Sequence, residues 1–88
     1  ISEAFPNPFN PNTTLEFNVH EEVLVKITIY NQLGKRVKDL VNENYAVGTH
    51  SVLWNSTNNQ GKQVSAGVYI YSIQAGEFRA TKKMVLLK

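Results

Sequence analysis

Apolar and polar residues alternate along most of this 88-residue chain. Alternation with a period of two is typical of β-strands that bury one face and expose the other. It predicts strands over residues 15–19, 23–30, 35–41, 49–55, 67–74 and 78–87. The one charged stretch with some helical character, residues 35–43, is short and contains β-branched residues, so we expect no helix there.

Turn-forming residues separate these runs. Asn31 to Gly34 predicts a tight turn, because Gly34 can adopt the positive φ that such turns require. Residues 55–62 form the longest polar loop, rich in asparagine. Within residues 35–41 we expect Val37 and Leu40 to face inward, and their odd spacing predicts a β-bulge or an irregular end of the strand.

The spacing of strands and turns defines the expected fold class. Strands that recur every 8–12 residues or so, with short loops between them, indicate an all-β protein with antiparallel pairing. We predict an Ig-like or fibronectin-III-like antiparallel β-sandwich of about seven strands, with Val64 beginning a short additional strand. The expected core is Phe17, Val25, Ile27, Ile29, Val52, Trp54, Tyr69, Tyr71 and Ile73.

All three prolines lie in the first twelve residues. Proline fixes its own φ and favours extended geometry in the residue before it, so residues 1–12 are predicted to form a stiff connector. Phe5 and Phe9 are expected to anchor it to a sandwich spanning residues 13–88. Since the sequence begins with Ile1 rather than Met, we expect a piece of a longer protein.

Length and charge exclude several classes of function. Eighty-eight residues suit one small domain, and the net charge of +2 is too low to indicate a nucleic-acid partner. Four basic residues near the end, Arg79, Lys82, Lys83 and Lys88, fit a solvated strand that resists edge pairing. No apolar run reaches the roughly 20 residues of a transmembrane helix, and no signal peptide opens the sequence.

The residues available for catalysis or metal binding are few. A Ser-His-Asp catalytic triad would have to use Asp39 with either His20 or His50. The sequence contains no nucleophile-elbow motif to supply the serine. We therefore predict no enzyme activity and no catalytic residues. The chain lacks cysteine, and residues 55–61 contain no carboxylate to bind calcium, so we expect no metal and no cofactor.

Nine aromatic residues leave a binding function open. A carbohydrate-binding module would expose a flat row of aromatic side chains, whereas alternation of Trp54 with Val52 indicates that Trp54 is buried. A sugar-binding module and a structural spacer, either of them appended to a secreted hydrolase, remain alternatives. Tyr69 and Tyr71 share one face of their strand while Val68 and Ile70 share the other, which indicates a central strand.

Four motifs, in order, resemble one known family. Pro6 to Pro11 followed by Thr13–Phe17 resembles its opening motif, and residues 25–34 (VKITIYNQLG) resemble its strand and turn. Residues 48–55 (GTHSVLWN) resemble its central segment. Gly67-Val68-Tyr69 and Lys83–Lys88 (KMVLLK) resemble its closing hairpin. The family is the C-terminal sorting domain of the type IX secretion system (Por secretion tail), related to the Ig-like domain of flagellar hook-cap proteins.

This resemblance implies a role in protein secretion. Such domains end large proteins that Gram-negative bacteria export through the periplasm to the cell surface or the medium. The implied partners are the outer-membrane secretion translocon, a sortase-like processing machinery and an upstream cargo domain in the same chain, and a weak edge-strand dimer stays open. The expected recognition residues are Gly67, Val68, Tyr69, Lys82, Lys83, Met84, Val85, Leu86, Leu87 and Lys88, because a terminal strand can offer its edge to a receptor.

Overall fold

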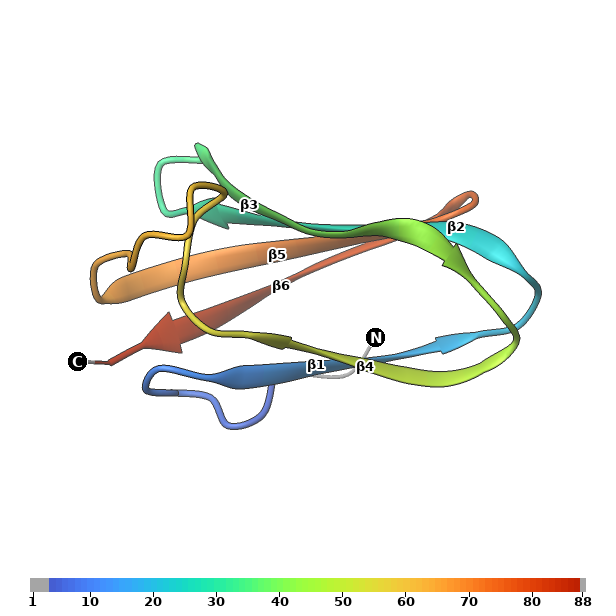
Figure 1. Cartoon of the computed structure of the whole chain (residues 1–88), viewed down its shortest axis with the longest axis horizontal. Coiled ribbons are helices and arrows are strands. Elements are labelled where there is room, and N and C mark those ends of the chain that lie inside the picture. Colours follow the sequence, from blue (N-terminus) through green and yellow to red (C-terminus); the bar gives the residue numbers. More distant parts are fainter. Residues whose placement is uncertain (1–3, 88) are drawn as a thin grey trace.

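The computed structural model describes residues 4–87 and shows an all-β protein. Its strands are β1 (Thr13–Val19), β2 (Val23–Asn31), β3 (Arg36–Tyr45), β4 (Gly48–Trp54), β5 (Gly67–Ala75) and β6 (Phe78–Leu86). β1 pairs with β4, and the other sheet has the order β3-β2-β5-β6. Every strand pairing is antiparallel. The two sheets face each other as the layers of a sandwich (Figure 1), which confirms the predicted fold class.

The sandwich has six strands rather than the seven predicted. The expected strand at Val64 does not form, because the backbone groups there close a loop. The Val64 N–H donates to the Ser56 carbonyl at 2.9 Å, and Thr57 and Gln63 form a single isolated bridge. The hydrogen bonds of this segment thus stay within the connection between β4 and β5.

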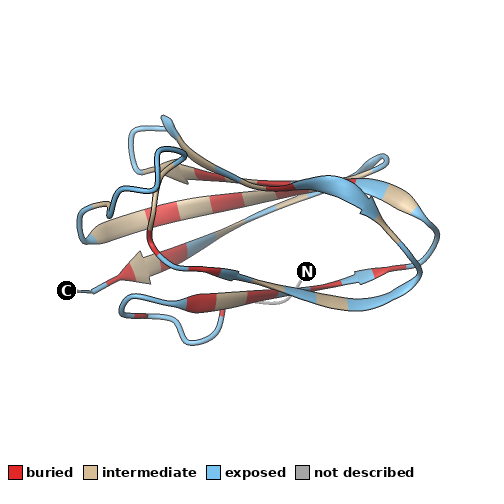
Figure 2. Ribbon diagram, in the orientation of Figure 1, coloured by how far each residue is buried: buried red, intermediate tan, exposed pale blue. Residues whose placement is uncertain are grey.

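The core lies between the sheets, and buried positions alternate along β1, β2 and β5 (Figure 2). All of the expected core residues are buried except Val52, which is half-buried against the core. Trp54 is fully buried and lies between two other rings, with centroids 5.8 Å from Phe9 and 5.3 Å from Tyr69. Further core residues, outside the expected core set, are Ala4, Phe9, Leu15, Val19, Val41, Met84 and Leu86.

The pairing of β2 with β3 contains two irregularities. Its register shifts between Ile27 and Thr28 and again between Ile29 and Tyr30. Leu40 and Val37 are the residues of β3 skipped at these shifts, and both are half-buried against the core. The predicted bulge is therefore confirmed, because an extra residue on one strand lets side chains of uneven spacing face the same way.

Two loops with similar sequences adopt the same hydrogen-bond pattern. They are residues 31–35 (NQLGK) and residues 58–62 (NNQGK). In the first, Asn31 Oδ1 accepts from the N–H groups of Leu33 and Lys35 at 3.0 and 2.9 Å. In the second, Asn58 Oδ1 accepts from the residues two and four positions on, both at 3.0 Å. Gly34 and Gly61 take φ values of 84° and 80°, which only glycine adopts without strain.

The proline-rich segment packs on both sheets. Phe5 forms an antiparallel bridge with Thr14 of β1, and Phe9 forms a parallel bridge with Leu86 of β6. Of the two expected anchors, Phe9 is 2% exposed and Phe5 is 78% exposed. Ala4 is also buried, and its N–H donates to the Tyr71 hydroxyl at 2.9 Å. Phe9 therefore holds this segment to the core, and Phe5 does so only through its backbone.

Candidate recognition surface at the terminal strand

The residues expected to carry recognition come together on β5 and β6. Gly67 pairs with Leu86, Val68 with Val85, and Tyr69 with Met84. The two parts of the expected surface are thus side by side, although residues 70–81 separate them in the sequence. Lys88 lies outside the described residues.

Only part of this set can touch a partner in the folded state. Its inward-facing members are Tyr69, Met84 and Leu86, each 5% exposed or less. Val68 and Val85 are half-buried on the outer face of the sheet. Gly67, which pairs with Leu86, and Lys82 are half-buried on the inner face. Lys83 and Leu87 are exposed. The accessible surface of the terminal strand therefore consists of Lys83, Leu87 and the flank of Val85.

The outer edge of β6 is closed at its C-terminal end by the proline-rich segment. Asn7 Oδ1 accepts from the Val85 N–H at 2.9 Å, and Asn7 Nδ2 donates to the Lys83 carbonyl at 3.4 Å. Next to it, the Phe9 N–H donates to the Val85 carbonyl and the Phe9 carbonyl accepts from Leu87 N–H, at 3.0 and 2.8 Å. We call residues 7–9 with these four bonds the N-terminal clip.

The opposite edge of the same sheet is closed by another asparagine. The Asp39 N–H donates to Asn59 Oδ1 at 2.9 Å, and the Asn59 N–H donates to the Val37 carbonyl at 3.2 Å. An edge strand with unpaired backbone groups can pair with another chain, so such coverings limit aggregation. The sheet is thus capped on both sides by asparagine side chains that imitate a neighbouring strand.

The N-terminal end of β6 is not covered in this way. Val85 and Leu87 turn their N–H groups to the outer edge, so alternation places those of Arg79, Thr81 and Lys83 there too. The outward N–H and C=O groups of Arg79 and Thr81 have no hydrogen-bond partner within residues 4–87. We call this stretch, residues 79–83, the open edge of β6.

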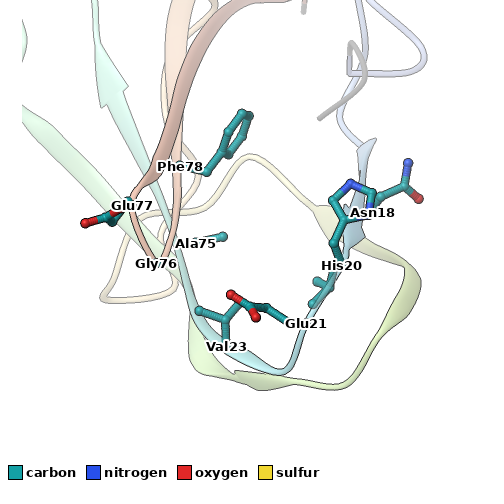
Figure 3. Close-up of a pocket in the computed structure, with 9 residues that line it drawn as sticks. Asn18, His20, Glu21, Val23, Ala75, Gly76, Glu77 and Phe78 are labelled. Atoms are coloured by element: carbon teal, nitrogen blue, oxygen red, sulfur yellow. The ribbon is translucent and has the colours of Figure 1, made fainter.

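A cavity lies at the end of the sandwich where the β5–β6 turn faces the end of β1, and Phe78, the first residue of β6, contributes to its lining. It has a volume of about 580 Å³. Figure 3 shows Phe78 on one side of it and His20 on the other. Its lining is partly apolar, through Val19, Val23 and Phe78, with the carboxylates of Glu21 and Glu77 also present.

The candidate catalytic and metal-binding residues are not gathered in one site. His50 contacts the Tyr45 ring, with centroids 4.7 Å apart, and a ring nitrogen lies 2.7 Å from the Ala46 carbonyl. His20 lines the cavity, while Asp39 pairs with Arg36 at 3.7 Å. Within residues 4–87, no group of three or more His, Asp or Glu side chains could hold a metal ion.

Two tyrosines have perturbed acidities. Burial raises the pKa of Tyr69, whose hydroxyl donates to the Ser65 carbonyl at 2.6 Å. Burial also raises the pKa of Tyr45, and the nearby Glu43 carboxylate raises it further. Both phenols are therefore neutral at physiological pH, and their hydroxyl groups can donate hydrogen bonds there.

The aromatic residues do not form a sugar-binding platform. Trp54, Tyr69 and Tyr71 are at most 5% exposed. The large aromatic side chains that are exposed among the described residues are Phe5 and Phe78, which belong to the proline-rich segment and the β5–β6 hairpin. The geometry that a carbohydrate-binding module needs is thus absent from residues 4–87.

The chain matches the model of a known protein family. The model described as "Secretion system C-terminal sorting domain" matches residues 3–87, nearly the whole chain. No curated protein matches the sequence. Among residues 4–87 there is no helix long and apolar enough to cross a membrane.

Several solved structures share the fold of this chain. Dimeric latent PorU from Porphyromonas gingivalis matches with a TM-score of 0.75 and 20% identity, covering 97% of this chain and 9% of that one. PorZ, a surface component of the type IX secretion system of the same organism, matches with a TM-score of 0.66 and 17% identity. The match covers 98% of this chain and 11% of PorZ. FlgD from P. aeruginosa matches with a TM-score of 0.66 and 20% identity, and the match covers 84% of this chain and 57% of FlgD. The chain therefore spans about a tenth of the two Porphyromonas proteins that it resembles.

Proposed function

This chain belongs to the family of secretion system C-terminal sorting domains, and we propose that its terminal strand is the part that the secretion machinery reads. Domains of this family mark exported proteins for the type IX system, which delivers them to the cell surface or the medium. The family match across residues 3–87 is the observation that carries this function. The fold supports it, because the chain is a self-contained sandwich whose last strand is an edge strand.

The recognition surface that we propose is Lys82–Lys88, supported by Gly67–Tyr69. The pairing of β5 with β6 holds these segments together, and Lys83 and Leu87 are its exposed side chains. We propose the outer-membrane translocon as the receptor, with a sortase-like enzyme processing the exported protein afterwards. A strand edge is a suitable target, since backbone hydrogen bonds supply affinity while side chains supply specificity.

We also propose that residues 1–12 join the sandwich of residues 13–88 to an upstream cargo domain. The domain itself is inferred to have no catalytic role, since sorting requires only binding. The N-terminal clip would confine a weak edge-strand dimer to the open edge of β6, where a second copy would place like charges opposite each other, so we do not propose a dimer.

Export of a reporter fused to this chain tests the function. The fusion is expressed in a host with type IX machinery, with and without residues 83–88, and surface, medium and periplasmic fractions are compared. Export that depends on these residues supports sorting, and equal export of both fusions contradicts it. Because Met84 and Leu86 are core residues, protease resistance of the truncated domain is measured in parallel.

A further inference from the structure

Residues 7–9 of the same chain cover only about half of the outer edge of β6. Residues 7–9 pair with Lys83–Leu87 as an added strand would, through backbone bonds of Phe9 and the side chain of Asn7. This contact shows that the edge can accept an extended segment. In the other half, the open edge, the outward N–H and C=O groups of Arg79 and Thr81 are of the same kind and have no hydrogen-bond partner within residues 4–87.

We propose that the open edge of β6 binds an extended segment of another protein in which acidic and apolar residues alternate. The surface goes beyond the proposed sorting residues, with which it shares Lys82 and Lys83. The occupant would lie beside β6 as a fifth strand of the larger sheet. Its backbone would bond to the outward groups of Arg79 and Thr81, which is recognition by strand addition.

The acidic half of the pattern follows from the outer face of the edge. Arg79, Thr81 and Lys83 are exposed and point to the same side, since they are two positions apart. Side chains directly across two paired strands interact, and opposite charges stabilise the pair. Carboxylates at alternate positions of the added strand would meet Arg79 and Lys83.

The same charges disfavour a second copy of this chain as the occupant. In a symmetric antiparallel pair centred on Thr81, Arg79 of one copy would lie opposite Lys83 of the other. Like charges directly opposite each other destabilise paired strands. The charges therefore disfavour pairing of the open edge with the same edge of a second copy, while they favour pairing with an acidic strand.

The apolar half of the pattern follows from the cavity. Side chains of an added strand that face inward would enter the space beside Phe78, where the cavity of about 580 Å³ lies. Val19, Val23 and Ala75 contribute apolar lining there. A valine or leucine side chain of the partner would bury apolar surface in this cavity. Backbone hydrogen bonds along the edge would not fill the cavity by themselves.

Amide chemical-shift mapping on the whole 88-residue chain tests the proposal. The probe is a short synthetic peptide of alternating glutamate and valine, and the control peptide alternates lysine and valine. We expect shifts centred on the amides of Arg79, Thr81 and Lys83 with the acidic peptide, and weaker binding of the basic one. Shifts elsewhere, no shifts at millimolar peptide, or equal affinity for both peptides would overturn the proposal.

Two variants locate the contact. Thr81→Pro removes an N–H that does not serve the pairing with β5, so the fold tolerates it, and affinity should fall about tenfold or more relative to Thr81→Ala. Arg79→Glu should weaken binding of the acidic peptide and strengthen binding of the basic peptide. This variant keeps the test valid if the proline variant does not fold. Unchanged affinity in Arg79→Glu, or sedimentation showing that the chain dimerises through residues 79–83, contradicts the proposal.

The two proposals can fail separately. The sorting function is tested by export and depends on residues 83–88, whereas the peptide titration needs no secretion machinery. Normal export of Thr81→Pro together with lost peptide binding would leave both proposals standing as distinct surfaces. Normal peptide binding with failed export would remove the sorting signal alone.

Discussion

Asn7 accepts a hydrogen bond from the backbone of Val85 at 2.9 Å, across 78 positions of sequence. The contact joins the start of the domain to its final strand and closes half of an exposed sheet edge. The same asparagine donates to the Lys83 carbonyl, so one side chain satisfies both kinds of backbone group. The terminal strand is therefore held from both sides, by β5 and by the N-terminal clip.

Replacing Asn7 with alanine should lower the free energy of unfolding by about 1 kcal/mol, because the backbone groups of Lys83 and Val85 lose a fixed partner to water. Urea denaturation measures the change. Amide exchange at Val85 should also become faster. Asn10→Ala is the matched control, since Asn10 is exposed in the same segment. Equal stability and equal Val85 exchange in the two variants would show that the clip does not contribute.

Trp54→Ala should cost about 3–5 kcal/mol, since the ring is fully buried between Phe9 and Tyr69. A domain of this size has a stability of about 5–10 kcal/mol, so the variant should be near unfolding at 37 °C. Leu53→Ala, at a side chain that is 54% exposed on the same strand, should change stability by less than about 0.5 kcal/mol. Similar melting temperatures for both variants would contradict the burial of Trp54.

Asn31→Ala and Asn58→Ala should each destabilise the domain by about 1–2 kcal/mol, because each Oδ1 accepts two backbone N–H groups. Asparagine to aspartate at either position keeps both acceptor bonds and should retain most of the stability. Thermal unfolding of the four variants makes the comparison. Aspartate variants as unstable as the alanine variants would mean that the amide group, rather than the oxygen, holds these turns.

Stability should fall as the pH rises above about 10, the usual pKa of tyrosine. The pKa values of Tyr45 and Tyr69 are raised in the folded state, mainly by burial. Below the unfolded pKa both states hold the phenol protons, and the stabilisation is complete. Above it the unfolded chain releases protons first, so stability is lost until the pH passes the folded pKa.

Urea unfolding between pH 8 and pH 11, or thereabouts, measures this loss. Tyr69→Phe should reduce the slope in the alkaline range, although it costs some stability at neutral pH by removing the bond to the Ser65 carbonyl. Tyr30→Phe controls for the loss of a phenol elsewhere on the sheet. An identical alkaline slope in all three proteins would exclude the raised pKa of Tyr69 as a cause.

Strand positions and most of the core were predictable because period-two alternation reports which face is buried. The bulges at Val37 and Leu40 were predictable for the same reason, since two inward residues with uneven spacing require an extra residue in the strand. Phe9 and Phe5 show the limit of this reasoning. Both lie in the proline-rich segment, where no alternation exists, and only tertiary packing distinguishes the buried ring from the exposed one.

The edge contacts could not be predicted from local sequence. Asn7 and Asn59 each stand in a polar stretch where a turn or a solvated loop is the simplest interpretation. Their roles depend on backbone groups of β6 and β3, and pattern alone does not say which strands are edges. The repeated sequences NQLGK and NNQGK were visible, and comparing them would have indicated that the two turns share one geometry.

The central claim is that exposed side chains of the terminal strand carry the sorting signal. A reporter fused to the chain with Lys83→Glu and Leu87→Ser tests it most directly, because both residues are exposed and the core is unchanged. The matched control carries Lys26→Glu and Leu53→Ser, which make the same changes at exposed positions on β2 and β4.

Protease resistance of the purified domains should show both variants folded. Export to the surface or medium should fall about tenfold in the terminal-strand variant, the effect of losing about 1.4 kcal/mol of recognition, and should be normal in the control. Normal export of both variants, with the domain folded, would contradict a signal carried by the exposed face of the terminal strand.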